Sequence, residues 1–146
     1  MIKTKKLPEH VLNGISLLSK RLQREENITA LYLFGSAVKG YLNPLSDLDL
    51  AALLDKKIRQ DKLFDEYLKI YDITSDILKT DEFDLIILNQ APLRFANNIL
   101  RTGRLLFCKD TKQLSAFIEM NYKYFLDFNF YKQQFNKSFQ HHLGIL

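Results

Sequence analysis

The residues best suited to chemistry lie in the segment FGSAVKGYLNPLSDLDL, residues 34–50. The pair Gly35-Ser36 is followed, after ten intervening residues, by Asp47 and Asp49 with a single leucine between them. Because side chains alternate between the two faces of a strand, both carboxylates would project from the same face. Two negative charges at that separation repel each other unless a cation screens them. The spacing therefore predicts a divalent-cation site, and its oxygen ligands suit Mg²⁺, with Mn²⁺ as an alternative.

The Gly-Ser turn upstream of these aspartates has the features of a phosphate-binding site. Gly35 allows close approach of the backbone, and the Ser36 hydroxyl and neighbouring amides can donate to phosphate oxygens. A helix that begins at Ser36 would add the favourable field of its N-terminus, and Lys39 would add a positive charge. We also assign Ser46, next to Asp47, to the nucleotide-binding residues. A metal-bound triphosphate at this turn would neutralise the charge of the aspartates.

A third carboxylate, Asp84, begins the apolar run DLIIL and completes the predicted catalytic and metal-binding set with Asp47 and Asp49. Three carboxylates can hold two metal ions, of which one stabilises a leaving pyrophosphate and the other lowers the pKa of an attacking hydroxyl. That is the chemistry of nucleotidyl transfer to a hydroxyl from a nucleoside triphosphate. An Asp-x-Asp pair alone is more often two solvated charges at a strand end, so the prediction depends on its combination with the Gly-Ser turn.

The elements that must position these residues alternate along the chain. Apolar residues at helical spacing predict helices over 8–27, 59–79 and 92–103. Short apolar runs predict strands over 30–34, 47–55, 83–88 and 104–108. Residues 40–46, which include Gly, Asn, Pro and Ser, predict a loop. Strands that alternate with helices predict an α/β fold with a small sheet.

The composition limits the class of protein and of partner. The 146 residues fit one domain, and they carry a net charge of +4 and an isoelectric point of about 9.1. No apolar run approaches the roughly 18 residues that cross a membrane, and no export signal is evident. The single cysteine, Cys108, leads us to expect a reducing cytoplasm. The positive charge favours an anionic partner, but the scattered lysines make nucleic acid an unlikely direct substrate.

The two motif-bearing segments resemble a known family. GSAVKGYLNPLSDLDL (35–50) fits the Gly-Ser-x10-Asp-x-Asp signature of the DNA polymerase beta-like nucleotidyltransferase superfamily. EFDLIILNQAPLRFANNILRTGRLLF (82–107) looks like the segment after the third carboxylate in its minimal branch, the MNT-domain antitoxins that are encoded beside HEPN-domain toxins. The resemblance implies a small mixed sheet flanked by helices, with a C-terminal helical extension.

The same resemblance implies a function and its participants. Gly35 and Ser36 match the phosphate-binding turn, and the three aspartates match the metal-binding, catalytic set. The family implies Mg²⁺, ATP as substrate, and transfer of AMP to a tyrosine of a cognate HEPN ribonuclease toxin, which inactivates that toxin within a hetero-oligomeric complex. One departure is Lys39, where many members carry arginine, because lysine keeps the charge but loses the forked geometry.

The C-terminal part of the chain is assigned separately. We divide the chain into a minimal nucleotidyltransferase domain over 1–110 and a helical extension of the same domain over 111–146, with one long helix or two shorter ones from about Thr111 to His142. Aromatic residues fall near one stripe of this helix: Phe117, Tyr124, Phe128, Tyr131, Phe135 and Phe139. We expect the stripe to pack on the protein's own core. The alternative is a face that binds a partner.

Two other functions stay open on the sequence alone. One is an antitoxin that neutralises its toxin by binding, without catalysis. The other is nucleotidyl transfer to a small molecule or an RNA end. Enzymes of that second kind usually carry a further domain to hold the acceptor, whereas only about 35 residues follow the catalytic segments here. The short extension therefore favours an acceptor that arrives on another macromolecule.

Overall fold

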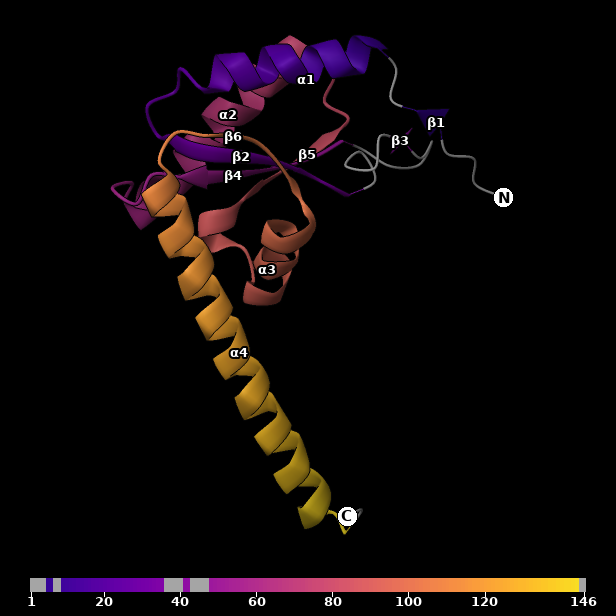
Figure 1. Ribbon diagram of the computed structural model, residues 1–146, viewed down its shortest axis with the longest axis vertical. Helices are drawn as coiled ribbons and strands as arrows, with labels where there is room; N and C mark the ends of the chain where they lie inside the picture. Colours follow the sequence, from indigo (N-terminus) through magenta and orange to yellow (C-terminus); the bar gives the residue numbers. More distant parts are fainter. Residues whose placement is uncertain (1–4, 7–8, 36–40, 43–47, 145–146) are drawn as a thin grey trace.

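A four-stranded sheet lies at the centre of the computed structural model, which describes residues 5–6, 9–35, 41–42 and 48–144 (Figure 1). Its order is β5-β4-β2-β6, from β5 (Phe83–Ile87) through β4 (Leu48–Leu54) and β2 (Ile28–Phe34) to β6 (Arg104–Cys108). β4 runs antiparallel to β2 and parallel to β5, and β6 runs antiparallel to β2. The small mixed sheet that the sequence predicted is therefore confirmed.

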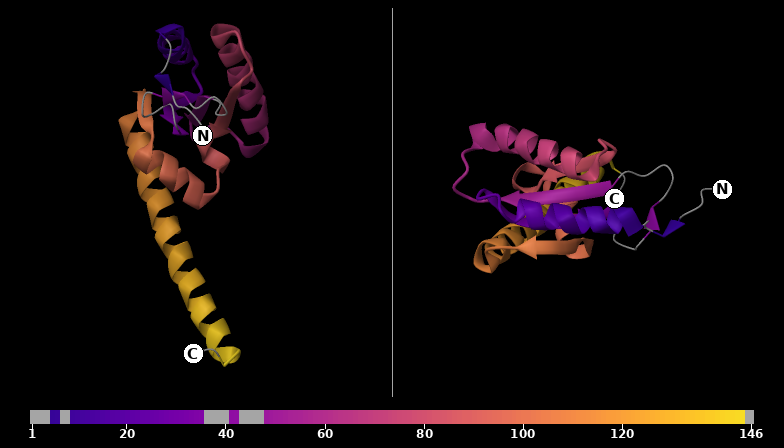
Figure 2. Two further views of the ribbon diagram at one scale, coloured as in Figure 1. Left: turned by 90° about the vertical axis from the view of Figure 1, so that its right-hand side faces the viewer. Right: turned by 90° about the horizontal axis from the view of Figure 1, so that it is seen from above.

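Helices cover both faces of this sheet (Figures 1 and 2). α1 (Glu9–Leu22) and α2 (Leu63–Leu78) pack on one face, and α2 connects the parallel strands β4 and β5. α3 (Leu93–Thr102) and the first turns of α4 (Thr111–His142) pack on the other. Short 3-10 turns at Gln60–Lys62 and Leu88–Gln90 precede α2 and follow β5. The sheet is thus buried on two sides, which requires strands with almost no polar residues.

The alternation of side chains along β4 separates the two cores. Leu48 and Leu50 face α1 and α2, whereas Ala51 and Leu53 face α3 and α4. Each of these four side chains is at most 7% exposed, and full burial of a leucine contributes about 1.5–3 kcal/mol. Asp49 lies two residues before Ala51 and four before Leu53, so it faces the same side of the sheet and its carboxylate lies on the α3 side.

A separate two-stranded sheet forms beside the main one. β1 (Lys5–Lys6) pairs antiparallel with β3 (Tyr41–Leu42). The loop predicted over 40–46 is therefore wrong at Tyr41 and Leu42, and residues 40 and 43–46 lie outside the described part of the chain. A two-residue strand is too short to show an alternating pattern, so hydrophobic periodicity could not predict it.

α4 is one continuous helix of 32 residues that runs away from the sheet (Figure 1). Its N-terminus is capped by the Asp110 side chain, which accepts a hydrogen bond from the Gln113 amide. At 1.5 Å per residue the helix is about 48 Å long, whereas α3, which packs beside it, has 10 residues. Despite the length of α4, no helix in the described residues is apolar enough to cross a membrane.

The aromatic stripe of α4 does not pack as expected. Phe117, near the N-terminus of the helix, is partly buried against the second core. Farther along, Tyr124 is 51% exposed, Tyr131 is 69% exposed and Phe135 is 67% exposed. The expectation that the stripe packs on the protein's own core is correct for Phe117 and wrong for the residues beyond it. Helical spacing identifies an apolar face but not what covers it, and here α4 runs beyond the sheet and α3 (Figure 1).

Asn121 is a polar residue in the buried part of α4. Its side chain is 6% exposed, and among the described residues no donor reaches its Oδ1. A buried acceptor without a partner costs about 1–3 kcal/mol. We therefore expect Asn121→Leu to raise the free energy of unfolding by about 1 kcal/mol in urea titrations. The half-exposed Asn129 is the control, because Asn129→Leu should change stability by less than about 0.5 kcal/mol. Equal effects at both positions would contradict this account.

Glu25 joins the end of α1 to α2. Its carboxylate, 13% exposed, accepts a hydrogen bond from Arg21 at 2.6 Å and pairs with Lys69 at 3.0 Å. Burial alone would raise the pKa of Glu25, but the interactions with Arg21 and Lys69 outweigh it and lower the pKa. A carboxyl group with a lowered pKa stabilises the fold above its unfolded pKa, near 4.3, and this stabilisation is lost as the pH falls through the folded pKa.

We expect Glu25→Gln to lower the free energy of unfolding by roughly 1 kcal/mol at pH 7 and by less at pH 3. Urea titrations at the two pH values measure the difference. Glu26→Gln is the matched control, because Glu26 is 84% exposed and its ion pair with Lys57 lies in solvent. A loss of stability that stays constant between the two pH values would show that the ion pairs are not its cause.

Candidate active site

Two of the three predicted aspartates lie side by side on parallel strands. In the β4–β5 register, Asp49 is the direct partner of Asp84. Residues in register place their side chains on the same face, so both carboxylates project from the face that α3 covers. Asp49 is half-buried, whereas Asp84 is exposed because β5 is an edge strand. The start of β4 and the start of β5 therefore create an acidic site that opens to solvent.

Gly35 lies against this site from a third strand. It follows Phe34, the last residue of β2, which pairs with Asp49 in the β2–β4 register. The backbone of Gly35 has a φ of +76°, in the left-handed region that glycine favours. A Cβ added to Gly35 would overlap the Asp49 carboxylate. Both the backbone conformation and the close approach therefore require glycine at the turn that the sequence assigned to phosphate binding.

Aromatic side chains form the walls of a cavity that both aspartates line. The cavity has a volume of about 490 Å³. Phe34 and Phe95 meet edge to face with ring centroids 5.8 Å apart. Around the edge of β5, Tyr71 and Phe83 lie with ring centroids 4.7 Å apart. The site thus combines two acidic groups with aromatic walls in a cavity that is open to solvent.

Sequence reasoning missed these aromatic walls. Phe95 comes from α3, Tyr67 and Tyr71 from α2, and Phe34 from β2. Each was assigned only to its own helix or strand, because helical and strand periodicity locate the buried face of one element at a time. Their shared position at the acidic site arises from the way three elements meet around β4 and β5. No local motif could have signalled it.

Four predicted site residues lie outside the described part of the chain. These are Ser36, Lys39, Ser46 and Asp47. The structure therefore brings together Gly35, Asp49 and Asp84. Within the described ranges, no group of three His, Cys, Asp or Glu side chains forms a metal-binding cluster. The roles of the four outside residues stay predictions.

The described residues fit a hard divalent cation. Asp49 and Asp84 supply carboxylate oxygens from paired positions, and Mg²⁺ is typically bound by one or two carboxylates plus substrate phosphates. The absence of a Cβ at Gly35 lets the Asp49 carboxylate lie directly against the turn. A cation between the two strands would also offset the repulsion of neighbouring like charges.

The fold is shared with solved structures of toxin–antitoxin complexes. A chain in a structure of the toxin–antitoxin MntA–HepT is 16% identical, with a TM-score of 0.61, over 88% of this chain and 98% of that one. A chain in a toxin–antitoxin structure with AMP-PNP is 17% identical, with a TM-score of 0.63, over 91% of this chain and 99% of that one.

A third similar structure contains a tri-AMPylated Shewanella oneidensis HEPN toxin in complex with an MNT antitoxin. Its matching chain is 16% identical, with a TM-score of 0.59, over 90% of this chain and 98% of that one. At such identities the likeness establishes a common fold. No curated protein sequence matches this chain.

A family model provides the stronger sequence evidence. The model described as "Polymerase beta, Nucleotidyltransferase" matches residues 17–112. This match runs from the second half of α1 to the first residues of α4 and includes the whole four-stranded sheet, the Gly35 turn and the acidic pair. The chain belongs to the polymerase beta nucleotidyltransferase family.

Proposed function

We propose that this chain is an antitoxin that transfers AMP from ATP to a tyrosine of a HEPN ribonuclease toxin and thereby inactivates it. The observation that carries the proposal is the pairing of Asp49 and Asp84 beside the Gly35 turn. The family match supports nucleotidyl transfer as the reaction class. Similar folds in complexes described with AMP-PNP and with an AMPylated HEPN toxin support ATP and a protein acceptor.

The proposed reaction forms one phosphorus–oxygen bond and breaks another. The tyrosine hydroxyl oxygen attacks the α-phosphorus of ATP, and the bond from that phosphorus to the bridging oxygen of the β-phosphate breaks. The products are tyrosine O-linked AMP and pyrophosphate, and the hydroxyl proton is released. A bound divalent cation would stabilise the charge of the phosphates and lower the pKa of the attacking hydroxyl.

The chain's own residues bind and orient the reactants. Asp49 and Asp84 would hold the cation that accompanies ATP, and Asp47 is proposed as a third ligand. Gly35, which has no side chain of its own, would let the triphosphate approach the backbone of the turn beside the Asp49 carboxylate. Phe34 and Phe95, in edge-to-face contact, form an apolar wall on the same face.

The extension over 111–146 has a separate role in the proposal. Residues 1–110 would carry the chemistry, and α4 would serve recognition of the acceptor. Because the reaction consumes ATP, the proposal places the protein in the cytoplasm.

The direct test is transfer to the HEPN protein that the proposal names as the acceptor. The two purified proteins are incubated with ATP and MgCl₂, and the HEPN protein is analysed by intact-mass and peptide mass spectrometry. We expect the added mass of one or more AMP units on a tyrosine, and none when EDTA is present. Two folded proteins that associate but show no added mass would contradict the proposal.

A second function is favoured by the exposed face of α4, namely neutralisation of the toxin by binding alone. Asp49→Asn/Asp84→Asn separates the two functions, because it removes the acidic pair and leaves α4 unchanged. If the double variant at native expression still protects cells from the toxin, binding is sufficient. We expect protection to be lost.

A further inference from the structure

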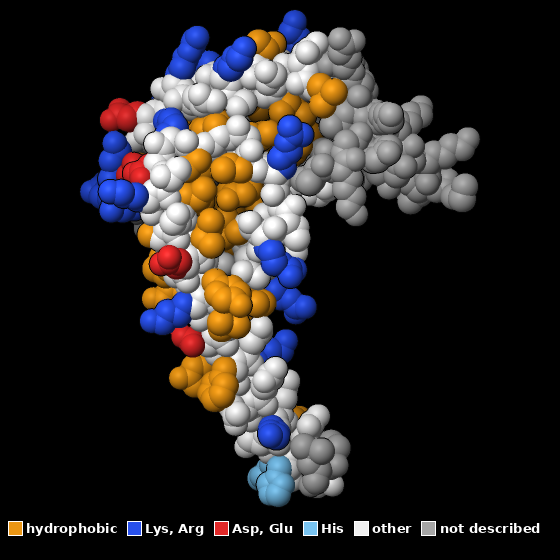
Figure 3. Space-filling view, viewed as in Figure 1, with side chains coloured by type: hydrophobic (Ala, Val, Ile, Leu, Met, Phe, Trp, Pro, Cys, Tyr) orange, Lys and Arg blue, Asp and Glu red, His pale blue; other side chains and the backbone are white. Residues whose placement is uncertain are grey.

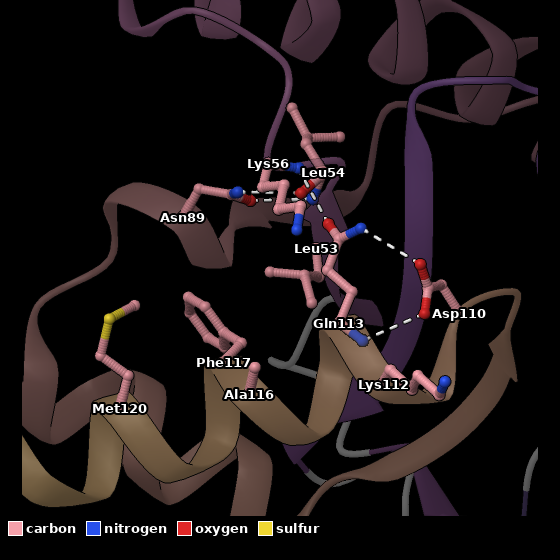
Figure 4. Close-up of a pocket in the computed structure, with 10 residues that line it drawn as sticks. All are labelled: Leu53, Leu54, Lys56, Asn89, Asp110, Lys112, Gln113, Ala116, Phe117 and Met120. Atoms are coloured by element: carbon pink, nitrogen blue, oxygen red, sulfur yellow. Dashed lines mark hydrogen bonds between the residues drawn. The ribbon is translucent and has the colours of Figure 1, made fainter.

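An apolar cavity of about 380 Å³ lies at the N-terminal end of α4 (Figure 4). It lies between the end of β4, the 3-10 turn after β5 and the first turns of α4. Leu53 contributes from the sheet, and Phe117 and Met120 rise toward it from α4 (Figure 4). Ala116, which is exposed, lies at the same surface of the helix. The cavity is therefore open and bounded mainly by apolar side chains.

Two of the polar side chains around this cavity, Asn89 and Gln113, already have hydrogen-bond partners. Asn89 donates to the Leu54 carbonyl and accepts from the Leu54 amide. The Gln113 Oε1 accepts from the Thr29 hydroxyl and from the Lys56 amide. A small ligand that bound to the Asn89 or Gln113 side chain would have to break these hydrogen bonds, whereas an apolar side chain would leave them intact. The cavity therefore suits an apolar anchor residue of another protein.

The aromatic stripe continues from this cavity along the exposed length of α4. We call the residues Tyr124, Phe128, Tyr131, Phe135 and Phe139 the α4 stripe; each is at least 51% exposed. Apolar side chains follow the helix far beyond the sheet in Figure 3. Helices in proteins are stabilised mainly by packing of an apolar face, and aromatic residues are enriched at interfaces. A protein that covers the α4 stripe would supply the packing that the domain does not.

The charges beside this surface select the kind of partner. Lys56 and Lys112 line the cavity together with one acidic residue, Asp110, whose carboxylate accepts a hydrogen bond from the Gln113 amide. Beyond Asn121, α4 carries Lys123, Lys132 and Lys137 but a single acidic residue, Asp127. A second copy of the chain would bring the same positive charge and would be repelled. A partner that has acidic residues around an apolar helical face would be attracted.

This surface lies on the same side of the sheet as the acidic site. Leu53 and Asp49 belong to the same face of β4, four residues apart, which is about 13 Å at the rise of a β-strand. α3 lies between them, with Phe95 at the acidic cavity and Ala96 and Ile99 in the core beside α4. A protein held along α4 can therefore bring one of its side chains to the aspartates.

We infer that the cavity and the α4 stripe together form the docking surface for the acceptor protein, with an apolar anchor in the cavity and acidic residues beside the lysines. This inference rests on the proposed function, since the acceptor is the HEPN toxin of that proposal. Docking along α4 covers the exposed aromatic residues of the helix and holds the acceptor tyrosine near Asp49 and Asp84.

The test measures the affinity of the purified chain for the HEPN protein. Ala116→Trp fills the cavity, and Phe128→Ser/Phe135→Ser removes two exposed aromatics of the α4 stripe. Each should raise Kd about tenfold or more, as expected for buried anchors at an interface. Wild-type Kd should also rise with salt, because the surface is basic. Leu12→Ser/Leu17→Ser on α1, at side chains 48% and 60% exposed, is the matched control and should bind as wild type.

A second readout separates this inference from the proposed function. AMP transfer by the α4 variants should be slow at low concentrations of the HEPN protein and should return to the wild-type rate at saturating concentrations. The variants should therefore raise KM and leave kcat unchanged. Asp84→Asn should bind the HEPN protein with the wild-type Kd. If wild type and Phe128→Ser/Phe135→Ser bind equally, or if neither binds, the docking surface is refuted.

Two further outcomes are decisive. If the variants lose affinity but the wild-type complex adds no AMP, the docking surface stands and the proposed transfer fails. If wild type alone is a dimer in light scattering, and Phe128→Ser/Phe135→Ser is a monomer, a second copy covers the α4 stripe and the inference is wrong. Circular dichroism and urea midpoints close to wild type establish that each variant is folded.

Discussion

Replacement of Asp84 by asparagine should reduce AMP transfer to the HEPN protein by about a hundredfold or more, the usual cost of one charge-stabilising group. Asp84 is the in-register partner of Asp49 and faces solvent, so it can bind a cation that arrives with ATP. Asparagine keeps the shape but lacks the negative charge that binds a divalent cation. Transfer is measured under single-turnover conditions with saturating HEPN protein.

The unfolding midpoint of Asp84→Asn shows whether a loss of AMP transfer comes from the missing carboxylate or from an unfolded protein. Asp84→Asn removes one of two neighbouring like charges, so its unfolding midpoint in urea should equal or exceed that of wild type. Asp81→Asn is the charge-matched control, because Asp81 is an exposed carboxylate before the same strand. It should transfer AMP at the wild-type rate. Wild-type activity in Asp84→Asn would exclude the acidic pair as the cation site.

Replacement of Gly35 by alanine should reduce transfer by about a hundredfold, because small displacements of a reacting or metal-binding group have effects of that size. The new Cβ would overlap the Asp49 carboxylate and force either this side chain or the turn to move. The positive φ adds about 1–2 kcal/mol of backbone strain. Gly35→Ala should therefore lower both activity and stability.

Gly144 provides a control with the same backbone conformation. Its φ is +75°, and a Cβ there would have no neighbour within 4 Å among the described residues. Gly144→Ala consequently introduces strain without a collision. It should cost about 1 kcal/mol or less at the frayed end of α4 and leave transfer unchanged. If the two substitutions affect transfer equally, contact with Asp49 is not the reason for glycine at position 35.

The sequence was sufficient for the elements and for part of the site. The helices around Ile15 and Ile70 and the strands β2, β4, β5 and β6 could be predicted because each depends on apolar periodicity within a few residues. The two-residue repeat of a strand also predicts that Asp49 faces the opposite side of the sheet from Leu48 and Leu50. These are local properties, and the structure reproduces them.

Pairings between distant segments were decided by tertiary structure. Asp49 and Asp84 are 35 positions apart, and their register depends on how α2, which connects β4 to β5 along the chain, packs on the sheet. The close approach of the Asp49 carboxylate to Gly35 likewise depends on the pairing of β2 with β4. Spacing along the chain suggested these neighbours, but only the packed sheet places them on one face.

The buried and exposed parts of the aromatic stripe of α4 show most clearly what could not be predicted from the sequence. Phe117 and Phe135 have the same residue type and lie on the same helical stripe, yet one packs in the core and the other is 67% exposed. The pattern of residues determined that α4 is a helix with an aromatic face. Which part of that face is buried was decided by where α3 and the sheet end, because burial depends on what lies opposite a side chain and not on the side chain itself.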